Sequence, residues 1–109
     1  MQQFDVCRNA GKGRAGYPYL VIVQSNAFAS GSHRVVVPLA LLAPGLTLRD
    51  EKLHPAFSIE GQAVHLSPLD ISSVPLIRIG EVVTSLYDQQ DLVRDAIDEM
   101  MRVHLPPAA

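Results

Sequence analysis

A glycine-rich segment near the N-terminus has the spacing of a phosphate-binding loop. Gly11-Lys12-Gly13-Arg14-Ala15-Gly16 reads as G-x-G-x-x-G, a motif that must follow a strand and open a helix so that a pyrophosphate meets the helix N-terminus. Here residues 19–23 follow, and they are strand-forming rather than helical. We therefore interpret residues 9–16 as a mobile hairpin loop in which glycine supplies positive φ. We expect Lys12 and Arg14 to make this loop a docking site for an acidic partner.

Residue types that bind metals or act as nucleophiles are few and scattered. The histidines, His33, His54, His65 and His104, lack the close pairs typical of zinc sites, and Cys7 is near none of them in sequence. No G-x-S-x-G elbow marks a nucleophilic serine, and Cys7, in an apolar strand, is expected to be a small buried hydrophobe. The sequence therefore predicts no metal, no cofactor, no catalytic residue and no turnover of small substrates.

Length and composition are those of one folded domain, residues 1–109. A hydrophobic content of 48% and a charged content of 18% exclude general disorder. The net charge of -2 argues against nucleic-acid binding, which needs a basic surface. A single cysteine favours a reducing compartment, and no signal peptide is visible at the start of the sequence. The richest apolar stretch, 35–42, is too short to span a membrane.

Strand-forming runs fill the first part of the chain. Residues 4–7, 19–23 and 34–37 predict three strands, and the second should be covered on both faces because its apolar residues do not alternate with polar ones. Pro38 is expected to end the third strand, since proline has no N–H to donate to a ladder.

The middle of the chain predicts a hairpin and one further strand. Residues 57–59 and 62–66 flank Glu60-Gly61, which indicates a tight turn. Residues 68–75 are expected to form a loop or a single turn. Residues 76–79 then predict a strand that Gly80 closes.

The last part of the chain changes to a helical period. We expect a helix over about 89–103, with Asp88 as its N-terminal cap and with Asp98 and Arg102 paired one turn apart. The order of strands followed by one helix predicts a small antiparallel β structure with a helix packed on it. The apolar residues on one face of this helix are Leu92, Val93, Ala96, Ile97, Met100 and Met101.

Several short segments, taken in order, resemble a known family. They are Gln3-Phe4-Asp5-Val6, Tyr19-Leu20-Val21-Ile22-Val23-Gln24-Ser25-Asn26, Arg34-Val35-Val36-Val37-Pro38-Leu39, Ser73-Val74-Pro75, Ile79-Gly80-Glu81 and Asp95-Ala96-Ile97-Asp98. This set is similar to the CcdB family of toxins from bacterial toxin–antitoxin modules, over residues 3 to about 101. The resemblance implies a cytoplasmic homodimer with an SH3-like antiparallel β barrel, a small additional sheet and a C-terminal helix.

The resemblance also implies a function by binding. Family members hold DNA gyrase in its DNA-cleaving state by binding the A subunit, and a cognate antitoxin with a disordered tail releases the enzyme. Such a toxin is not an enzyme. The best-known members end in Trp-Gly-Ile, whose tryptophan is the anchor on gyrase, but this chain has no tryptophan. Its aligned positions are Arg102, Val103 and His104, and these with Met101 are the expected target contact.

Two alternatives to a gyrase toxin stay open. The chain could keep the fold and the antitoxin while having lost or changed its target. It could also be an endoribonuclease, because the MazF family of toxins shares this barrel and fold does not fix function. His33, Arg34 and Thr47 are candidates for that chemistry, although nothing in their spacing singles them out. Whichever target the chain has, an acidic antitoxin tail is expected to contact Lys12 and Arg14.

A homodimer is also expected from the residues themselves. The apolar run 35–42 gives a small sheet more apolar surface than one helix can cover. A two-fold interface would bury the remainder.

Overall fold

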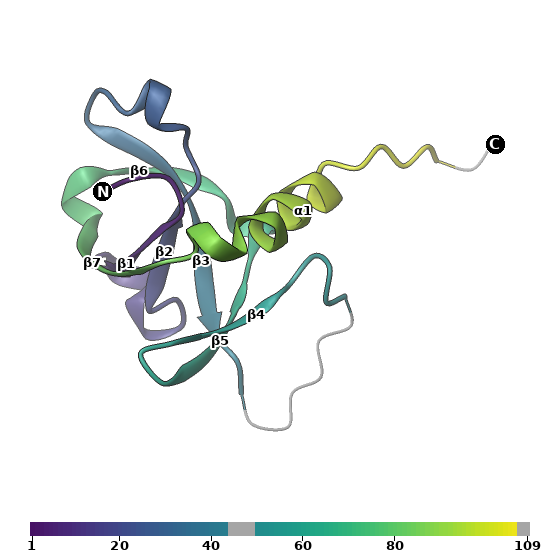
Figure 1. Cartoon of the computed structure of the whole chain (residues 1–109), viewed down its shortest axis with the longest axis horizontal. Coiled ribbons are helices and arrows are strands. Elements are labelled where there is room, and N and C mark those ends of the chain that lie inside the picture. The colour runs from purple at the N-terminus through teal and green to yellow at the C-terminus, as the bar shows by residue number, and fades with distance from the viewer. Residues whose placement is uncertain (44–49, 107–109) are drawn as a thin grey trace.

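Seven antiparallel strands form one curled sheet in the part of the chain that the computed structural model describes, residues 1–43 and 50–106. Their order is β4-β5-β3-β2-β1-β7, and β6 pairs with the first half of β3. Figure 1 shows the sheet curling into part of a barrel, with the β4–β5 hairpin as a smaller extension. The strands are β1 (Asp5–Asn9), β2 (Tyr19–Ile22), β3 (His33–Leu41), β4 (Ala56–Ile59), β5 (Gln62–Leu66), β6 (Ser72–Pro75) and β7 (Ile79–Ser85).

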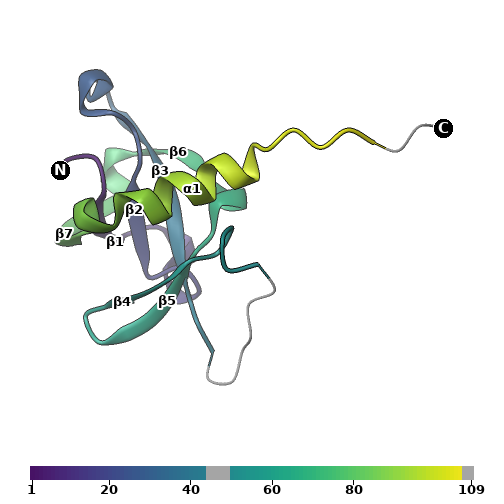
Figure 2. The same cartoon turned by 45° about the vertical axis from the view of Figure 1, so that its right-hand side comes forward.

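The one α-helix of these described residues, α1 (Gln90–Met100), follows all the strands. It lies against the sheet in Figures 1 and 2, and its Val93 and Ala96 are fully buried. The predicted mainly β fold with one C-terminal helix is confirmed. Over the same ranges, no helix has the length and apolar character that a membrane span requires. Short 3₁₀ helices connect the other elements: η1 (Lys12–Ala15), η2 (Asn26–Phe28), η3 (Pro68–Asp70), η4 (Leu76–Arg78) and η5 (Tyr87–Gln89).

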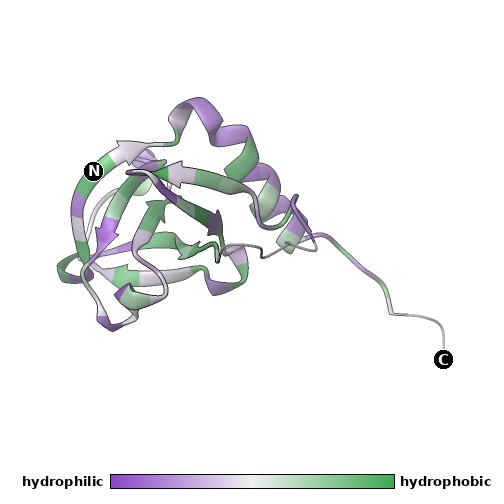
Figure 3. Ribbon diagram, turned by 90° about the horizontal axis from the view of Figure 1, so that it is seen from below, coloured by the Kyte–Doolittle hydropathy of each residue, from purple (hydrophilic) through white to green (hydrophobic). Residues whose placement is uncertain are grey.

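The strand β2 is buried on both faces, as its uninterrupted apolar run predicts. Tyr19 and Val21 belong to a large core shared with the β4–β5 hairpin and α1, on what we call the helix face of the sheet. Leu20 and Ile22 belong to a smaller core on the opposite side, which we call the outer face. The strands in Figure 3 are accordingly mostly hydrophobic (green), whereas α1 alternates between hydrophilic (purple) and hydrophobic (green) residues along its length.

Pro38 does not end β3, which continues to Leu41. On one side β3 pairs with β2 throughout this region, and on the other side β6 pairs up to Val36 and β5 pairs from Leu39 onward. The Pro38 carbonyl accepts a hydrogen bond from the Ser67 N–H at 3.0 Å, on the side where the chain leaves the sheet between β5 and β6. The prediction was wrong because the nitrogen of Pro38 faces this gap, where no ladder bond is required.

The predicted hairpin is confirmed as β4 and β5. Its two turn residues, Glu60 and Gly61, have φ of 51° and 79°. Positive φ at both positions is the type I′ turn that matches the twist of paired strands. This turn places the Glu60 side chain within hydrogen-bond distance of Arg8 in β1 and Tyr19 in β2.

The region after the hairpin differs from its prediction in two ways. Residues 72–75 form a strand, β6, rather than a loop, and η4 replaces the first part of the strand expected at 76–79. Gly80 does not close a strand but lies inside β7, where a Cβ would be 3.0 Å from the Arg8 carbonyl oxygen. Here glycine permits the close approach of β7 to β1 at a register shift between the two strands.

The helix is shorter than predicted. Residues 87–89 are 3₁₀, and among the described side chains none caps α1, so Asp88 is not the N-terminal cap. Arg102 pairs with Glu99 at 3.3 Å instead of with Asp98. The i,i+3 pair forms because the chain leaves the α-helix at Met101, which ends the i,i+4 geometry that the prediction assumed.

Candidate functional site

The two described residues proposed for ribonuclease chemistry, His33 and Arg34, are both engaged in local hydrogen bonds. The Arg34 guanidinium donates hydrogen bonds to the carbonyl oxygens of Ala29 (3.1 Å), Gly31 (3.1 Å) and His33 (2.8 Å). It therefore orders the loop before β3 rather than facing a cleft. The His33 ring shares a 2.9 Å hydrogen bond with Ser32, and Thr47 lies outside the described residues.

Neither a metal cluster nor a reactive thiol is found in the described part of the chain. It contains no group of three or more His, Cys, Asp or Glu side chains that could hold a metal ion. Cys7 is fully buried, as expected for a small hydrophobe. Burial, together with the nearby Asp5 carboxylate, raises the pKa of its thiol to about 11, so the thiolate is scarce at neutral pH.

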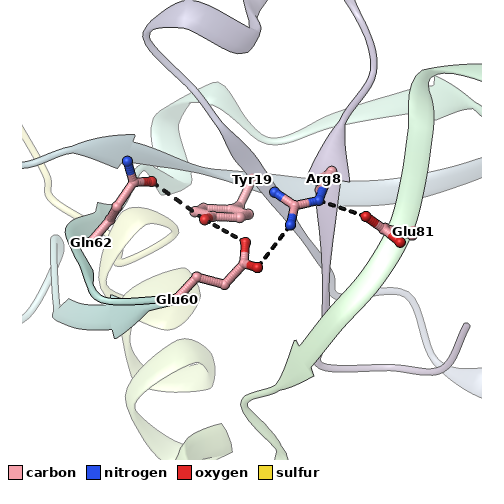
Figure 4. Close-up of polar contacts among 5 residues, drawn as sticks. All are labelled: Arg8, Tyr19, Glu60, Gln62 and Glu81. Atoms are coloured by element: carbon pink, nitrogen blue, oxygen red, sulfur yellow. Dashed lines mark hydrogen bonds and ion pairs between the residues drawn. The ribbon is translucent and has the colours of Figure 1, made fainter.

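A polar cluster on the helix face joins the β4–β5 hairpin to three other strands, and we call it the Arg8 clasp. It consists of Arg8, Tyr19, Glu60, Gln62 and Glu81 (Figure 4). The Arg8 guanidinium donates to Glu60 at 2.8 Å and to Glu81 at 2.7 Å. The Tyr19 phenol donates to the other Glu60 oxygen at 2.8 Å. The clasp thereby ties the β4–β5 turn to β1, β2 and β7.

The Arg8 clasp contains groups that catalysis could use: a proton donor (Tyr19), a proton acceptor (Glu60) and a cation (Arg8). Each of them, however, already makes hydrogen bonds within the clasp. The hydrogen bond to Glu81 raises the pKa of Arg8, and Glu60 acts in the same direction. Burial and then the bond to Glu60 raise the pKa of Tyr19. Because both Glu60 oxygens accept bonds and the cation contacts two carboxylates, an incoming phosphate would meet more negative than positive charge. This arrangement supports a structural role.

A cleft of about 340 Å³ lies on the outer face, between η1, β6 and η4, and we call it the outer cleft. Its floor is formed by Leu20, Pro38 and Val74, which come from β2, β3 and β6. Its rim carries two cations, Lys12 and Arg78, and the Tyr17–Asp70 pair.

Asn9, at the end of β1, shapes the loop that borders the outer cleft. Its side chain accepts a bond from the Gly11 N–H at 2.9 Å and donates to the Tyr17 carbonyl oxygen at 2.8 Å. The Ala10 N–H donates to the Arg78 carbonyl oxygen at 3.0 Å, which joins this loop to η4. The loop connects two paired strands, as predicted, and contains the turn η1. Its mobility stays a prediction.

The rim of the outer cleft has an unbalanced charge. Within the described ranges, neither Lys12 nor Arg78 has an acidic group within 4.0 Å. The Tyr17 phenol donates to Asp70 at 2.9 Å, and this bond raises the pKa of Tyr17. The Ser67 hydroxyl donates to the same Asp70 oxygen at 2.6 Å.

One of the two predicted antitoxin contacts lines this cleft. Lys12 does, whereas Arg14 does not: its guanidinium donates to the Gly11 carbonyl oxygen at 3.2 Å. Sequence reasoning missed Arg78 and Asp70. Arg78 comes beside Lys12 only through the pairing of β1 with β7, which no local pattern shows. Ser67-Pro68 did signal a turn that could have drawn attention to Asp70.

The four predicted target contacts lie together where the chain leaves α1. Met101 is 72% and Val103 83% exposed, and Arg102 and His104 are exposed as well. In Figures 1, 2 and 3 this segment runs away from the rest of the molecule. It therefore presents apolar and basic side chains that the body of the chain does not cover.

Two comparisons with known proteins match the chain over almost its full length. A family model described as CcdB protein matches residues 3–102. A solved structure of an endoribonuclease in complex with its cognate antitoxin, from Mycobacterial species, superposes with a TM-score of 0.72. That match covers 97% of this chain and 99% of the other at 16% sequence identity, a level at which the likeness shows the fold alone.

Proposed function

The chain belongs to the CcdB family of toxins from toxin–antitoxin modules, and from this premise we propose that it inhibits DNA gyrase by binding the A subunit. The proposed toxin acts in the cytoplasm and is neutralised by an antitoxin with a disordered tail. Inhibition would come from protein–protein contact rather than from catalysis.

The exposed segment at the end of α1 carries this proposal. By the resemblance it corresponds to the segment with which the family binds gyrase, and it offers Met101 and Val103 as exposed apolar surface. Arg102 adds a planar group with several donors, a residue type enriched at interface hot spots. Arg102 itself is exposed and pairs with Glu99 at 3.3 Å, and Glu99 also pairs with Lys52 at 3.5 Å. A partner could therefore take Arg102 from Glu99 without leaving that carboxylate unpaired.

Truncation after Met101 tests the proposal. We expect the truncated chain to keep its thermal stability but to lose inhibition of supercoiling by purified gyrase and of bacterial growth. A point variant sharpens the test: Val103→Asp should weaken inhibition about tenfold or more, because a charge enters an apolar contact. Phe28→Asp is the matched control, since Phe28 is 71% exposed on η2, in the connection between β2 and β3 rather than at the end of α1. Full inhibition by the truncated chain would refute this role of the segment.

The homodimer remains part of the proposal, but not for the reason that the apolar run suggested. Val36, Val37 and Leu39 are already fully buried within one chain. Support comes instead from family membership and from exposed apolar side chains such as Leu92 and Val82. Sedimentation at micromolar concentration should give twice the chain mass, and a monomer there would contradict the dimer.

An endoribonuclease is the second candidate, because the fold is shared with one over 97% of this chain. Cleavage of RNA needs a base, an acid and cations, and the outer cleft gathers Asp70, Tyr17, Lys12 and Arg78. RNA cleavage that Asp70→Asn abolishes would favour this candidate over gyrase binding. A full-length chain that inhibits neither supercoiling nor growth and leaves RNA intact would instead favour the third reading, an antitoxin-binding protein with another target.

A further inference from the structure

We propose that the outer cleft binds an extended peptide segment that combines an acidic and an apolar side chain. This inference rests on the proposed function in that the antitoxin tail is the source of the segment. A carboxylate of the peptide would lie between Lys12 and Arg78, with the neighbouring apolar side chain on the floor of the cleft.

The two cations provide the first argument. Arg78 lies beside the start of η1: a Cβ on Gly11 would be 3.7 Å from the Arg78 Cδ, and the Ala10 N–H donates to the Arg78 carbonyl oxygen at 3.0 Å. Lys12 and Arg78 line the same cleft, and no carboxylate of the described chain lies within 4.0 Å of either cation. Asp70 lies on the same rim but accepts its bonds from Tyr17 and Ser67. Two like charges in one small cleft disfavour each other, and an anion between them relieves that repulsion.

The floor provides the second argument. Leu20, Pro38 and Val74 form an apolar surface beneath the cations. A volume of about 340 Å³ is at the small end of the range for ligand pockets. This size suits a side chain or two of a peptide.

Asp70 distinguishes a peptide from a nucleic acid. One of its oxygens accepts bonds from Tyr17 and Ser67, whereas the other has no hydrogen-bond donor among the residues described. A peptide supplies backbone N–H groups to such an oxygen. A phosphodiester chain is negative at every step and would be repelled there, and the whole chain already carries a net charge of -2. The rim therefore favours a ligand with a carboxylate at one end and N–H donors at the other.

Titration of the full-length, ¹⁵N-labelled chain with a capped five-residue peptide of alternating aspartate and leucine tests this inference. We expect the amide signals that shift to be those of 9–17 and 72–78. The double variant Lys12→Glu, Arg78→Glu should raise the Kd about tenfold at low salt and less at high salt. Arg14→Glu is the matched control, with the same charge reversal on η1 but outside the cleft, and should change Kd less than about twofold. Replacing leucine by serine in the peptide should also weaken binding.

Several outcomes would overturn the inference. Shifts confined to the end of α1, or an equal effect of Arg14→Glu, would remove the cleft from peptide recognition. Inorganic phosphate or an oligouridylate that shifts the same amides at lower concentration would identify a general anion site or an RNA site. A well-dispersed spectrum of the double variant shows that the fold is intact. Inhibition of growth by the double variant, measured separately, keeps the two proposals apart, since toxicity can persist when peptide binding is lost.

Discussion

Each face of the sheet carries a tyrosine bonded to a carboxylate, yet the two faces hold their cations differently. On the helix face, Arg8 contacts both Glu60 and Glu81 within 2.8 Å. On the outer face, Lys12 and Arg78 border a cleft, and in the described parts of the chain no carboxylate lies within 4.0 Å of either. A cation with two partners stabilises the chain that contains it, whereas a cation without one is available to another molecule.

The largest effect is expected at the turn that places the clasp. Gly61→Val should lower the free energy of unfolding by about 1–3 kcal/mol, because a β-branched residue is strained at a φ of 79°. Gly16→Val is the control, since Gly16 has φ of −92° and, like Gly61, leaves open space for a Cβ. Urea unfolding measures both. An equal loss at Gly16 would show that φ is not the cause.

The clasp itself should contribute less. Glu60→Ala is expected to reduce stability by about 1 kcal/mol, because Arg8 loses one partner and the buried Tyr19 loses its strongest acceptor. Glu81→Ala should cost less than about 0.5 kcal/mol, since that carboxylate is mostly exposed. Thermal unfolding of the two variants compares them, and the same small loss for both would contradict the role of Glu60.

The cations of the outer cleft should matter still less for folding. The double variant Lys12→Gln, Arg78→Gln is expected to unfold within about 0.5 kcal/mol of the parent chain, because neither side chain has an acidic partner within 4.0 Å among residues 1–43 and 50–106. Denaturant unfolding tests this directly. A loss of more than about 1 kcal/mol would place these cations in the structural class with Arg8.

The smallest effect on stability is expected from the ionisation of two phenols, those of Tyr17 and Tyr19. Both have a pKa above the ordinary 10.0, so the unfolded chain releases these protons first and stability declines as the pH rises above about 10. Asp70→Asn should return the pKa of Tyr17 towards its ordinary value, because the bond to Asp70 is its main cause. Glu60→Gln should leave much of the rise at Tyr19, whose main cause is burial. NMR titration of the Tyr Cζ signals distinguishes them, and equal responses would contradict this difference.

The parts of the fold that the sequence predicts are those encoded locally. The apolar run of β2 requires cover on both faces, and Glu60-Gly61 permits a two-residue turn, so both were predictable. β6 was missed because Ser72 to Pro75 becomes a strand only by pairing with β3. In the same way, η4 and the continuation of β7 beyond Gly80 depend on contacts with β1. That strand is about seventy positions away in the chain, so no local pattern indicates these contacts.

The candidate sites follow the same division. Lys12 was recognisable as an exposed cation in a glycine-rich loop. Its neighbour Arg78 was not, because pairing between the ends of the chain brings it there. Arg8 and Glu60 form an ion pair across 52 positions, and neither residue has a local pattern that announces the other.

Pro38 also protects the alignment of the strands. If β3 slid by two residues against β5 or β6, the proline would leave the gap and stand opposite a carbonyl group to which it could donate nothing. Such a slip would keep every side chain on its proper face, so the hydrophobic pattern alone would not reject it. The missing N–H makes the slipped arrangement poorer by a hydrogen bond. A residue that first suggests the end of a strand thus helps to select the correct partner positions during folding.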